Sequence, residues 1–475
     1  MFYMKCYNCG YEDSEINYEN FICPKCGKLM FYSLEKKDLA YLREKMLNLI
    51  SNQKISSIWS FRDFFPIQSI SSISLGEGNT PFIHANNLKK QLNVTHLFLK
   101  DETKNPTNSF RDRAASLIVS IAKKLKYSKI VCSTNGNMGA SIAAYASKAR
   151  LESIIVVPRN VDYGKLAQII AFGGNVITHG DSVDDTFDFS RKIAIERKAY
   201  NATPEFNALA IEGQKTISYE IYMQLGSIPD IMIVPTGSGS SLVSLWKGFQ
   251  ELKILGLINN MPKFVIAQPS KCSPIVSKFH SGETTESLGP TSALGLYVKK
   301  PLFIDLVIKI LRETKGLAVS VEEKSISEAE KMLAKHEAIF AEPASAVGIA
   351  SIKLLKEMNI IEGDEKIVAL VTGSGLKASY ILDAFVSKRG QKTIYPKVST
   401  KIEILRFLTF GPSYGYEIWK KVKPDLKFQA IYQHLQELRE KGLVDETTKD
   451  RRKYYKITEK GKRLLEAFEE ITLLL

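Results

Sequence analysis

The 475-residue sequence lacks the features that would place a protein in a membrane or outside the cell. No apolar run approaches the roughly 20 residues that a membrane-spanning helix needs. The opening residues, MFYMKCYNCGYED, contain no apolar core followed by a small-residue cleavage site, so we expect no secretory signal. Internal repeats and low-complexity tracts are also missing. We therefore expect a cytoplasmic protein that makes no membrane contact.

The composition is that of an ordinary globular protein, with 44% hydrophobic and 24% charged residues. A chain of this length is too long for one small core, so about two to four domains are expected. The formal net charge of +14 favours an anionic partner, either nucleic acid or a phosphorylated metabolite. Surplus lysine can also be a solvated surface, so the charge alone does not decide between these readings.

Cysteine is scarce, and four of the six cysteines form two C-x-x-C pairs. Cys6 and Cys9 make the first pair, Cys23 and Cys26 make the second, and thirteen residues lie between the pairs. A glycine follows each pair and lets the backbone turn, so that amides can face the thiolates. This spacing predicts a structural zinc ribbon without an open coordination position.

Disulfides and a redox site are the alternative interpretations of the two cysteine pairs. Disulfides fit poorly with a cytosolic chain, and a redox C-x-x-C is expected beside a βαβ pattern, which is missing around residues 6–26. Cys132 and Cys272 lie in apolar segments, which indicates buried packing.

Short apolar runs alternate with amphipathic segments from about residue 94 to residue 390. This alternation predicts an α/β fold, with parallel sheets covered by helices on both faces and about 300 residues divided into two lobes. After QKTIYPKVST the sequence pattern changes and predicts short helices and a charged hairpin. We therefore expect a domain boundary near Gln391 to Pro396.

Four polar loops stand at predicted strand-to-helix junctions. Their sequences are NPTNSFRDR (105–113), STNGNMGAS (133–141), PTGSGSSL (235–242) and TGSGLK (372–377). Ligands of α/β folds bind at the carboxyl ends of strands, against helix N-termini. The third loop is suited to cradle a phosphate with backbone amides and hydroxyls. Together the loops favour a phosphate-bearing ligand.

These loops resemble those of threonine synthases, of the tryptophan synthase β family of pyridoxal-phosphate enzymes. SLGEGNTPF (74–82), LKDET (99–103) and IFAEPASAVGIASI (339–352) carry the same resemblance in the same order. It covers residues 1 to about 390 and includes the zinc-ribbon start of some members. It implies a two-lobed fold of type II, in which Asn137 contacts the ring hydroxyl of the cofactor. Gly237, Ser238, Gly239, Ser240 and Ser241 would cradle its phosphate, and Thr372 would face its pyridine nitrogen.

The first loop departs from the family at the residue on which the chemistry depends. The family reads NPTGSFKDR and uses the lysine for the Schiff base with the cofactor, whereas this chain has Arg111. An imine needs a neutral primary amine, which a guanidinium cannot provide. Asn108, Asn135 and Ser241 are further departures, and such clustering favours drift or a change of task over a single engineered inactivation.

Two roles are open for Arg111. Its planar fork could bind an anion, such as a phosphorylated amino acid or noncovalently held pyridoxal phosphate. Alternatively it pairs with Asp101, Glu102 or Asp112 and the pocket is vestigial. Replacement of the missing amine by Lys100, Lys104 or Lys377 is disfavoured, because the family does not use those positions.

Residues 397–475 resemble a winged helix of the PadR or MarR type, on the phrases LQELREKGLV, RRKYYKIT and TEKGKRLL. The third helix would enter the major groove of DNA and present Gln429, Tyr432, Gln433 and Gln436. Arg451, Arg452 and Lys453, at the tip of the wing, would contact phosphates. The segment holds 17 Lys and Arg against 12 Asp and Glu, a net charge of +5. We favour DNA binding over the alternative of a protein-docking or dimerisation module.

The sequence thus predicts a zinc ribbon (1–32), a connecting segment (33–93), a two-lobed α/β domain (94–390) and a winged helix (397–475). The exposed apolar end, Ile471 to Leu475, suggests a homodimer contact. We favour a transcriptional regulator whose threonine-synthase-like body senses a small phosphorylated metabolite or an amino acid. A working threonine synthase, which converts O-phosphohomoserine to threonine and phosphate, is the first alternative. An inactive scaffold is the second.

Overall fold

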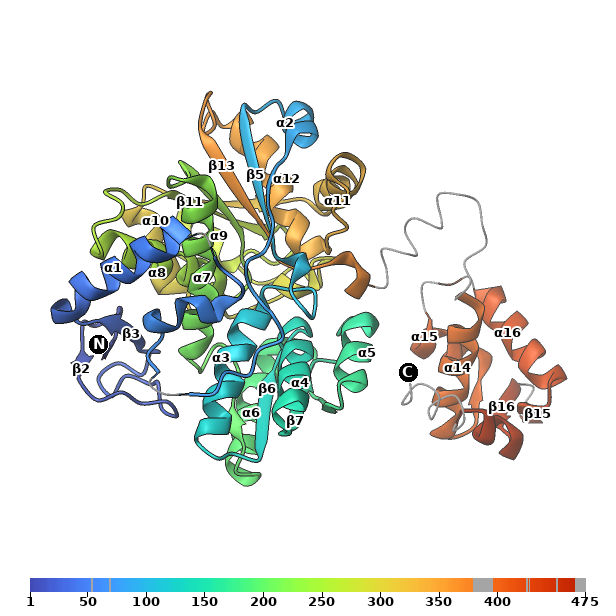
Figure 1. Ribbon diagram of the computed structural model, residues 1–475. Helices are drawn as coiled ribbons and strands as arrows, with labels where there is room; N and C mark the ends of the chain where they lie inside the picture. Colours follow the sequence, from blue (N-terminus) through green and yellow to red (C-terminus); the bar gives the residue numbers. More distant parts are fainter. Residues whose placement is uncertain are drawn as a thin grey trace. The chain divides into compact units, whose positions relative to one another are not determined.

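The computed structural model describes residues 1–52, 54–67, 70–378, 396–423, 426, 428–449 and 452–465. The chain forms two compact units, Met1–Ser379 and Tyr380–Leu475 (Figure 1). The boundary expected near Gln391 to Pro396 lies outside the described residues, except for Pro396, which starts the first helix of the second unit. The apolar end from Ile471 to Leu475 also lies outside them, so the dimer contact stays a prediction.

The larger lobe of the first unit is built on a six-stranded sheet that is parallel except at one edge. Apolar β-branched runs such as IMIV form its central strands, as expected for strands buried on both faces. Across the sheet the strands are β12 (Leu317–Val321), β11 (Lys263–Pro269), β10 (Ile231–Pro235), β13 (Lys366–Val371), β5 (His96–Asp101) and the antiparallel edge strand β4 (Phe82–His84). Two-lobed α/β architecture is confirmed, with one antiparallel edge added.

The helices of this lobe cover the sheet. They are α1 (Leu39–Asn52), α2 (Asn86–Leu92), α7 (Leu209–Leu225), α8 (Ser240–Ile254), α9 (Pro274–Ser281), α10 (Ile304–Glu313), α11 (Glu323–Glu337) and α12 (Pro343–Glu357). Short 3-10 helices span 36–38, 58–64, 102–104, 294–296 and 375–377. β4 and α2 come from the expected connecting segment, 33–93, and join this lobe.

The smaller lobe has a parallel four-stranded sheet. Its strands run β8 (Asn175–Thr178), β7 (Glu152–Val157), β6 (Lys129–Ser133) and β9 (Tyr200–Asn201). Its helices are α3 (Arg111–Lys124), α4 (Asn137–Ala149), α5 (Tyr163–Ala171) and α6 (Val183–Glu196). α3 packs against both α4 and α7, and so joins the two lobes (Figure 1).

The N-terminal residues form a small antiparallel sheet on the larger lobe, with β1 (Phe2–Lys5) between β2 (Glu12–Asp13) and β3 (Phe31–Leu34). Tyr7 meets Trp246 of α8 edge to face, with ring centroids 5.1 Å apart. The ring centroids of Phe31 and Phe303 lie 6.3 Å apart. This sheet therefore shares the hydrophobic core of the first unit.

The second unit folds as the sequence predicts: its described residues form three helices, a β-hairpin and, at 459–465, the start of a last helix. The helices are α14 (Pro396–Thr409), α15 (Gly415–Val422) and α16 (Phe428–Glu440). The strands β15 (Val444–Lys449) and β16 (Arg452–Ile457) form the hairpin, and the short β14 (Ser413–Tyr414) pairs with β16. Leucine and isoleucine at helical spacing build its core, including Leu405, Ile418, Ile431 and Leu435.

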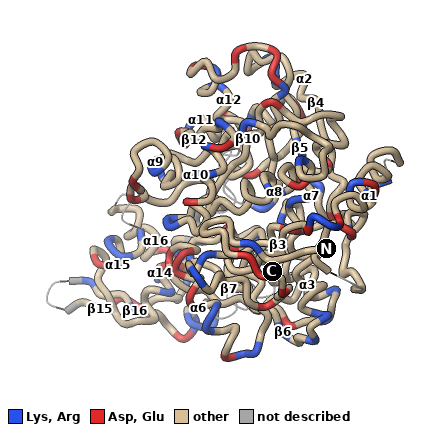
Figure 2. Tube along the Cα trace, turned by 90° about the vertical axis from the view of Figure 1, so that its left-hand side faces the viewer, with Lys and Arg blue, Asp and Glu red and all other residues tan. Residues whose placement is uncertain are grey.

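The positive charge is spread along the chain, and basic and acidic residues alternate over much of the trace (Figure 2). Among the described helices, none combines the length and the apolar character that crossing a bilayer requires. The net charge of +14 therefore does not come from one basic element.

A buried ion cluster fixes α3 against its neighbours. The Arg113 guanidinium, fully buried, donates to Glu102 at 2.8 Å and to Glu220 at 2.5 and 2.8 Å. Lys100 Nζ donates to Glu220 at 2.7 Å. Burial by itself would raise the pKa of Glu220, but Arg113 and Lys100 hold it well below its ordinary value. The cluster joins β5, α3 and α7 through buried charges that compensate one another.

We predict that Arg113→Met destabilises the first unit by about 3–5 kcal/mol, because two buried carboxylates lose their main partner. The free energy of unfolding from urea titration measures the effect. Arg43→Met, at an exposed position on α1, is the matched control and should change it by less than about 0.5 kcal/mol. A loss below about 1 kcal/mol for Arg113→Met would show that the cluster does not hold α3 in place.

Candidate functional site

A cleft lies where the carboxyl ends of strands from both lobes approach each other. Its walls come from the loops after β6, β9, β10 and β13 and from the first residues of α3, α4 and α8. The sequence-predicted residues Arg111, Asn137 and Thr372 line it, together with the whole loop 237–241. The structure therefore brings together all the residues predicted for the cofactor pocket.

Arg111 is the first residue of α3 and is half-buried in the cleft. Its Nη1 donates to Ser240 Oγ at 3.4 Å, and its guanidinium lies 4.6 Å from the centre of the Phe110 ring. Burial lowers the pKa of Arg111, and the carboxylates of Glu205 and Glu342 oppose that shift. The guanidinium remains charged at any physiological pH.

The structure does not show the alternative pairing of Arg111 with Asp101, Glu102 or Asp112. Glu102 is bound by Arg113, Asp112 accepts from the amide and hydroxyl of Thr107, and Asp101 accepts from the Thr103 amide. In the described part of the chain, Arg111 forms no ion pair within 4.0 Å. These three acids are held by other partners, and Arg111 lines the cleft without pairing with any of them.

The loop from Gly237 to Ser241 connects β10 to α8 at the edge of the cleft. Gly239 is the N-cap residue and has φ of +100°, and a Cβ at this position would lie 2.7 Å from Val307. Only glycine fits such a turn. The N-terminus of α8 therefore borders the cleft, and its unpaired amides make this end attractive to anions.

Glu342, at the N-cap of α12, bridges the two lobes. Its Oε1 accepts a hydrogen bond from Asn137 Nδ2 of α4 at 2.8 Å, and its Oε2 lies 3.1 Å from Lys165 Nζ of α5. Asp162 also binds Lys165, at 2.8 Å. Thr372 Oγ1 lies 2.9 Å from Ser345 Oγ at the back of the same wall. Asn137 is thus held by Glu342 from the opposite lobe.

None of the described residues that line the cleft is a lysine. Lys100 is bound to Glu220, and Lys104 is exposed to solvent. Lys377 is buried behind the cleft wall, where burial lowers its pKa to about 8 against the charges of Asp112 and Glu342. The amines named as substitutes therefore lie outside the cleft lining.

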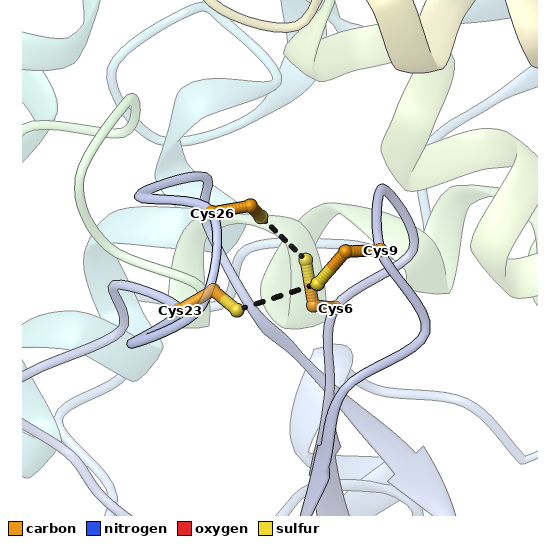
Figure 3. Close-up of side chains that lie close together, drawn as sticks. All are labelled: Cys6, Cys9, Cys23 and Cys26. Carbon is orange, nitrogen blue, oxygen red and sulfur yellow. Dashed lines mark hydrogen bonds between the residues drawn. The ribbon is translucent and has the colours of Figure 1, made fainter.

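The four cysteines of the two C-x-x-C pairs come together at one end of the N-terminal sheet (Figure 3). Sγ of Cys6 lies 3.5 Å from Sγ of Cys26, and Sγ of Cys9 lies 3.6 Å from Sγ of Cys23. All four sulfur atoms lie within 4.8 Å of one another and are free thiols. A tetrahedral ion with bonds of about 2.3 Å requires sulfur atoms about 3.8 Å apart, so the cluster could hold a metal ion.

The two glycines that follow the cysteine pairs adopt the expected turns. Gly10 has φ of +77° and donates its amide to the Cys6 carbonyl at 2.8 Å. Gly27 has φ of +69° and donates to the Cys23 carbonyl at 2.9 Å. A hydrogen bond from the Lys28 amide lowers the pKa of Cys26 to about 6. These turns shape both halves of the cluster in the same way.

In the second unit, α16 carries the residues predicted to read DNA. Gln429, Gln433 and Gln436 are exposed at successive turns of this helix. Tyr432 is half-buried, and its ring packs against Phe428 at 5.0 Å and beside Gly415. Tyr432 thus contributes to packing between α15 and α16. The three glutamines alone present an open polar face.

The hairpin has the form predicted for a wing, but its tip is only partly described. Arg451 lies outside the described residues, as does the side chain of Arg452. Lys453 forms an ion pair with Glu446 at 2.8 Å, and Arg439 of α16 binds the same carboxylate at 2.9 Å. Glu446 thus ties the wing to α16.

Comparison with known families covers both units. Residues 73–373 match the pyridoxal-phosphate-dependent enzyme family, and residues 404–467 match the PadR-like family of transcriptional regulators. The threonine synthase of Methanocaldococcus jannaschii is 36% identical over 389 residues, which is 78% of this chain and 92% of the relative. That of Methanosarcina acetivorans is 32% identical over 384 residues, or 79% and 92% of the two chains.

The chain belongs to the threonine synthase group of pyridoxal-phosphate-dependent enzymes. Solved structures agree on the fold. Threonine deaminase isoform 2 of Solanum lycopersicum aligns with a TM-score of 0.57 and 20% identity, over 79% of this chain and 94% of that one. Maize serine racemase aligns with a TM-score of 0.56 and 22% identity, over 66% and 93%. The fold type II expected from the motifs is confirmed.

The structure adds site residues that sequence reasoning missed within this family framework. Glu342 belongs to the motif FAEPAS in the sequence. Its role as a bridge between the lobes depends on Lys165, which is distant in sequence. Glu205, in the turn after β9, lines the cleft beside Ser238. No motif marks Glu205, because the segment PEFN resembles any polar turn. Both acids could be found only from their neighbours in space.

Proposed function

We propose that this chain is a ligand-sensing transcriptional regulator. Its threonine-synthase-like body binds a small molecule without turning it over, and its C-terminal winged helix binds DNA. The observation that carries the proposal is the position of Arg111. At the place expected for the lysine of the family, a fixed cation points into a cleft whose described lining contains no lysine.

Chemistry supports the loss of turnover. The family reaction needs a neutral primary amine that links to the cofactor and then moves protons at the substrate. A guanidinium with a pKa above about 12 does neither. Lys377 has the lowered pKa that such an amine needs, but it lies outside the cleft lining. The alternative of a working threonine synthase therefore lacks its central group.

The cleft fits pyridoxal phosphate in part. By the resemblance to the family, Thr372 and Asn137 would hold the ring and Gly237 to Ser241, at the start of α8, would hold the phosphate, and all of these residues line the cleft. When bound in this family, the cofactor supplies an electron sink for a carbanion. The residue at position 111 does not fit, since it cannot form the link. Any binding of the cofactor would thus be noncovalent.

DNA binding is supported by the second unit. Its match to PadR-like regulators, the exposed glutamines of α16 and the basic hairpin agree with one another. The glutamines 429, 433 and 436 would contact base edges in the major groove, and residues 451–453 would contact phosphates. A homodimer would place two such helices on a two-fold symmetric operator.

The four-cysteine cluster would hold a structural zinc ion. Four thiolates leave no open coordination position, which assigns the ion to folding and not to catalysis. The cluster belongs to the small sheet that packs on α8 through Tyr7 and Trp246. We infer that the zinc ion supports the helix whose N-terminus borders the cleft.

We predict one zinc ion per chain by atomic absorption, reduced to near zero in the double variant Cys23→Ser with Cys26→Ser. Thermal unfolding should begin at a lower temperature in that variant, because metal binding adds directly to folding free energy. Cys272→Ala, a buried cysteine outside the cluster, is the control and should keep its zinc. Full zinc retention in the double variant would refute the assignment.

We predict that the native chain, mixed with pyridoxal phosphate and reduced with borohydride, carries no pyridoxyl group on any cleft residue, by mass spectrometry of its peptides. It should also release no phosphate from O-phosphohomoserine. Arg111→Lys restores an amine at this position and is expected to become labelled there. Arg43→Lys, on the exposed face of α1, is the matched control. Labelling of a native lysine together with phosphate release would favour the enzyme reading.

We predict salt-sensitive binding of the full chain to DNA from its own promoter region, measured by fluorescence anisotropy. Arg451→Ala with Arg452→Ala should weaken binding about tenfold or more and reduce the salt slope by about 2, one unit for each lost phosphate contact. Arg43→Ala with Arg312→Ala removes the same charge from exposed positions of the first unit and should leave the slope unchanged. Binding that is absent, or that does not respond to salt, would contradict the regulator function.

A further inference from the structure

Two opposite charges lie at the loop from Gly237 to Ser241. Arg111 reaches Ser240 from α3, with its Nη1 3.4 Å from the hydroxyl oxygen. Glu205, in the turn after β9, lines the same cleft as Ser238, whose hydroxyl donates to Ser240 Oγ at 3.4 Å. Both side chains line the cleft and are half-buried. A loop that resembles a phosphate cradle thus has an internal carboxylate beside it.

The two charges face each other without closing into an ion pair. Within the described residues, no nitrogen of Arg111 lies within 4.0 Å of an oxygen of Glu205. Burial raises the pKa of Glu205, and the Arg111 charge opposes this shift more than any other group. Glu205 is likewise the leading charge that acts on Arg111. One cleft is therefore lined by a cation and by an anion that do not neutralise each other in an ion pair.

Some of the other polar groups of the cleft already have hydrogen-bond partners, and one does not. Glu342 has two partners, since it is bound by Asn137 at 2.8 Å and by Lys165 at 3.1 Å. Asn137 uses its Nδ2 for that bond, which leaves its buried Oδ1 without a hydrogen-bond partner. A buried acceptor without a partner is unfavourable, and a ligand group that donates a hydrogen bond would satisfy it. The cleft thus presents the Arg111 cation to a ligand group that accepts hydrogen bonds. It presents Glu205 and Asn137 Oδ1 to a ligand group that donates them.

These groups suit a zwitterion better than a phosphate ester. A phosphate in the loop would place its negative charge near the Glu205 carboxylate, and two like charges close together repel each other. A carboxylate fits the fork of Arg111, which can bind it through two parallel hydrogen bonds. An ammonium group donates three hydrogen bonds and would satisfy both Glu205 and Asn137 Oδ1.

We propose that the cleft binds an unphosphorylated zwitterion, a free amino acid held without a cofactor, and that Glu205 excludes phosphate esters from the loop. Arg111 binds the carboxylate, and Glu205 with Asn137 Oδ1 binds the ammonium group. Arg111 and Glu205 thereby determine the specificity of the site. The proposal names the ligand class of the sensing function above and rests on it.

Isothermal titration calorimetry on the full chain tests the ligand class. The probes are the standard amino acids and, for each that binds, its amine without the carboxylate and its N-acetyl derivative without the ammonium group. O-phospho-L-serine and pyridoxal phosphate are the phosphate probes. At least one free amino acid should bind, and loss of either charge should weaken binding at least tenfold. The proposal is overturned if no amino acid binds, or if a phosphate probe binds as tightly as the best amino acid.

Two variants test the assigned residues. Glu205→Gln should lose amino acid affinity at least tenfold and gain affinity for pyridoxal phosphate at least tenfold, a gain that an unfolded variant cannot show. Arg111→Gln should lose affinity for both. Glu283→Gln, at an exposed site, is the matched control and should resemble the native chain. Unchanged phosphate affinity in Glu205→Gln would remove Glu205 from the specificity role.

DNA binding measured on the same preparations separates this proposal from the function it deepens. Promoter binding that persists while no amino acid binds would overturn the ligand class and leave the DNA-binding role intact. Amino acid binding without any DNA binding would overturn the regulator function and uphold the assigned ligand site.

Discussion

The buried pairing of Arg113 with Glu102 and Glu220 sets the position of everything at the cleft. These ions are paired on all sides, so α3 cannot rotate without leaving a charge uncompensated in the core. Arg111 is two residues before Arg113 and points away from it on the helix surface, because successive residues are about 100° apart. Fixing one arginine in the core thus directs the other toward the cleft.

With Arg111 in this position, the cleft of the family fold carries a charge pattern that the family motifs do not predict. The family fold supplies the loop at the N-terminus of α8 and the wall around Thr372. Arg111 adds a permanent cation, and Glu205 adds a carboxylate that the loop motif does not foresee. The lobes remain joined across the cleft by Glu342, Lys165 and Asn137. The result is a cleft of the family fold that is lined by Arg111 and Glu205.

The cysteine cluster and the cleft belong to one packed body. Tyr7 lies against Trp246 of α8, and Phe31 lies against Phe303, whose amide donates to the Ser238 carbonyl at 3.4 Å. The small N-terminal sheet therefore supports the helix and the loop that line the cleft. The winged helix is a separate compact unit with its own core, as expected for an independent domain.

The sequence by itself determined the alternating α/β pattern, the four polar loops, the two cysteine pairs and the winged-helix pattern. These depend on local spacing, since residue order sets the period of strands and helices and the reach of a C-x-x-C turn. Only the tertiary structure decided that Arg111 is free of Asp101, Glu102 and Asp112, that Tyr432 packs between helices, and that Glu205 faces Arg111. Those outcomes depend on which distant residues compete for each charge or surface. Glu102 and Glu220, for example, are 118 residues apart in the sequence, and only folding brings them together around one guanidinium.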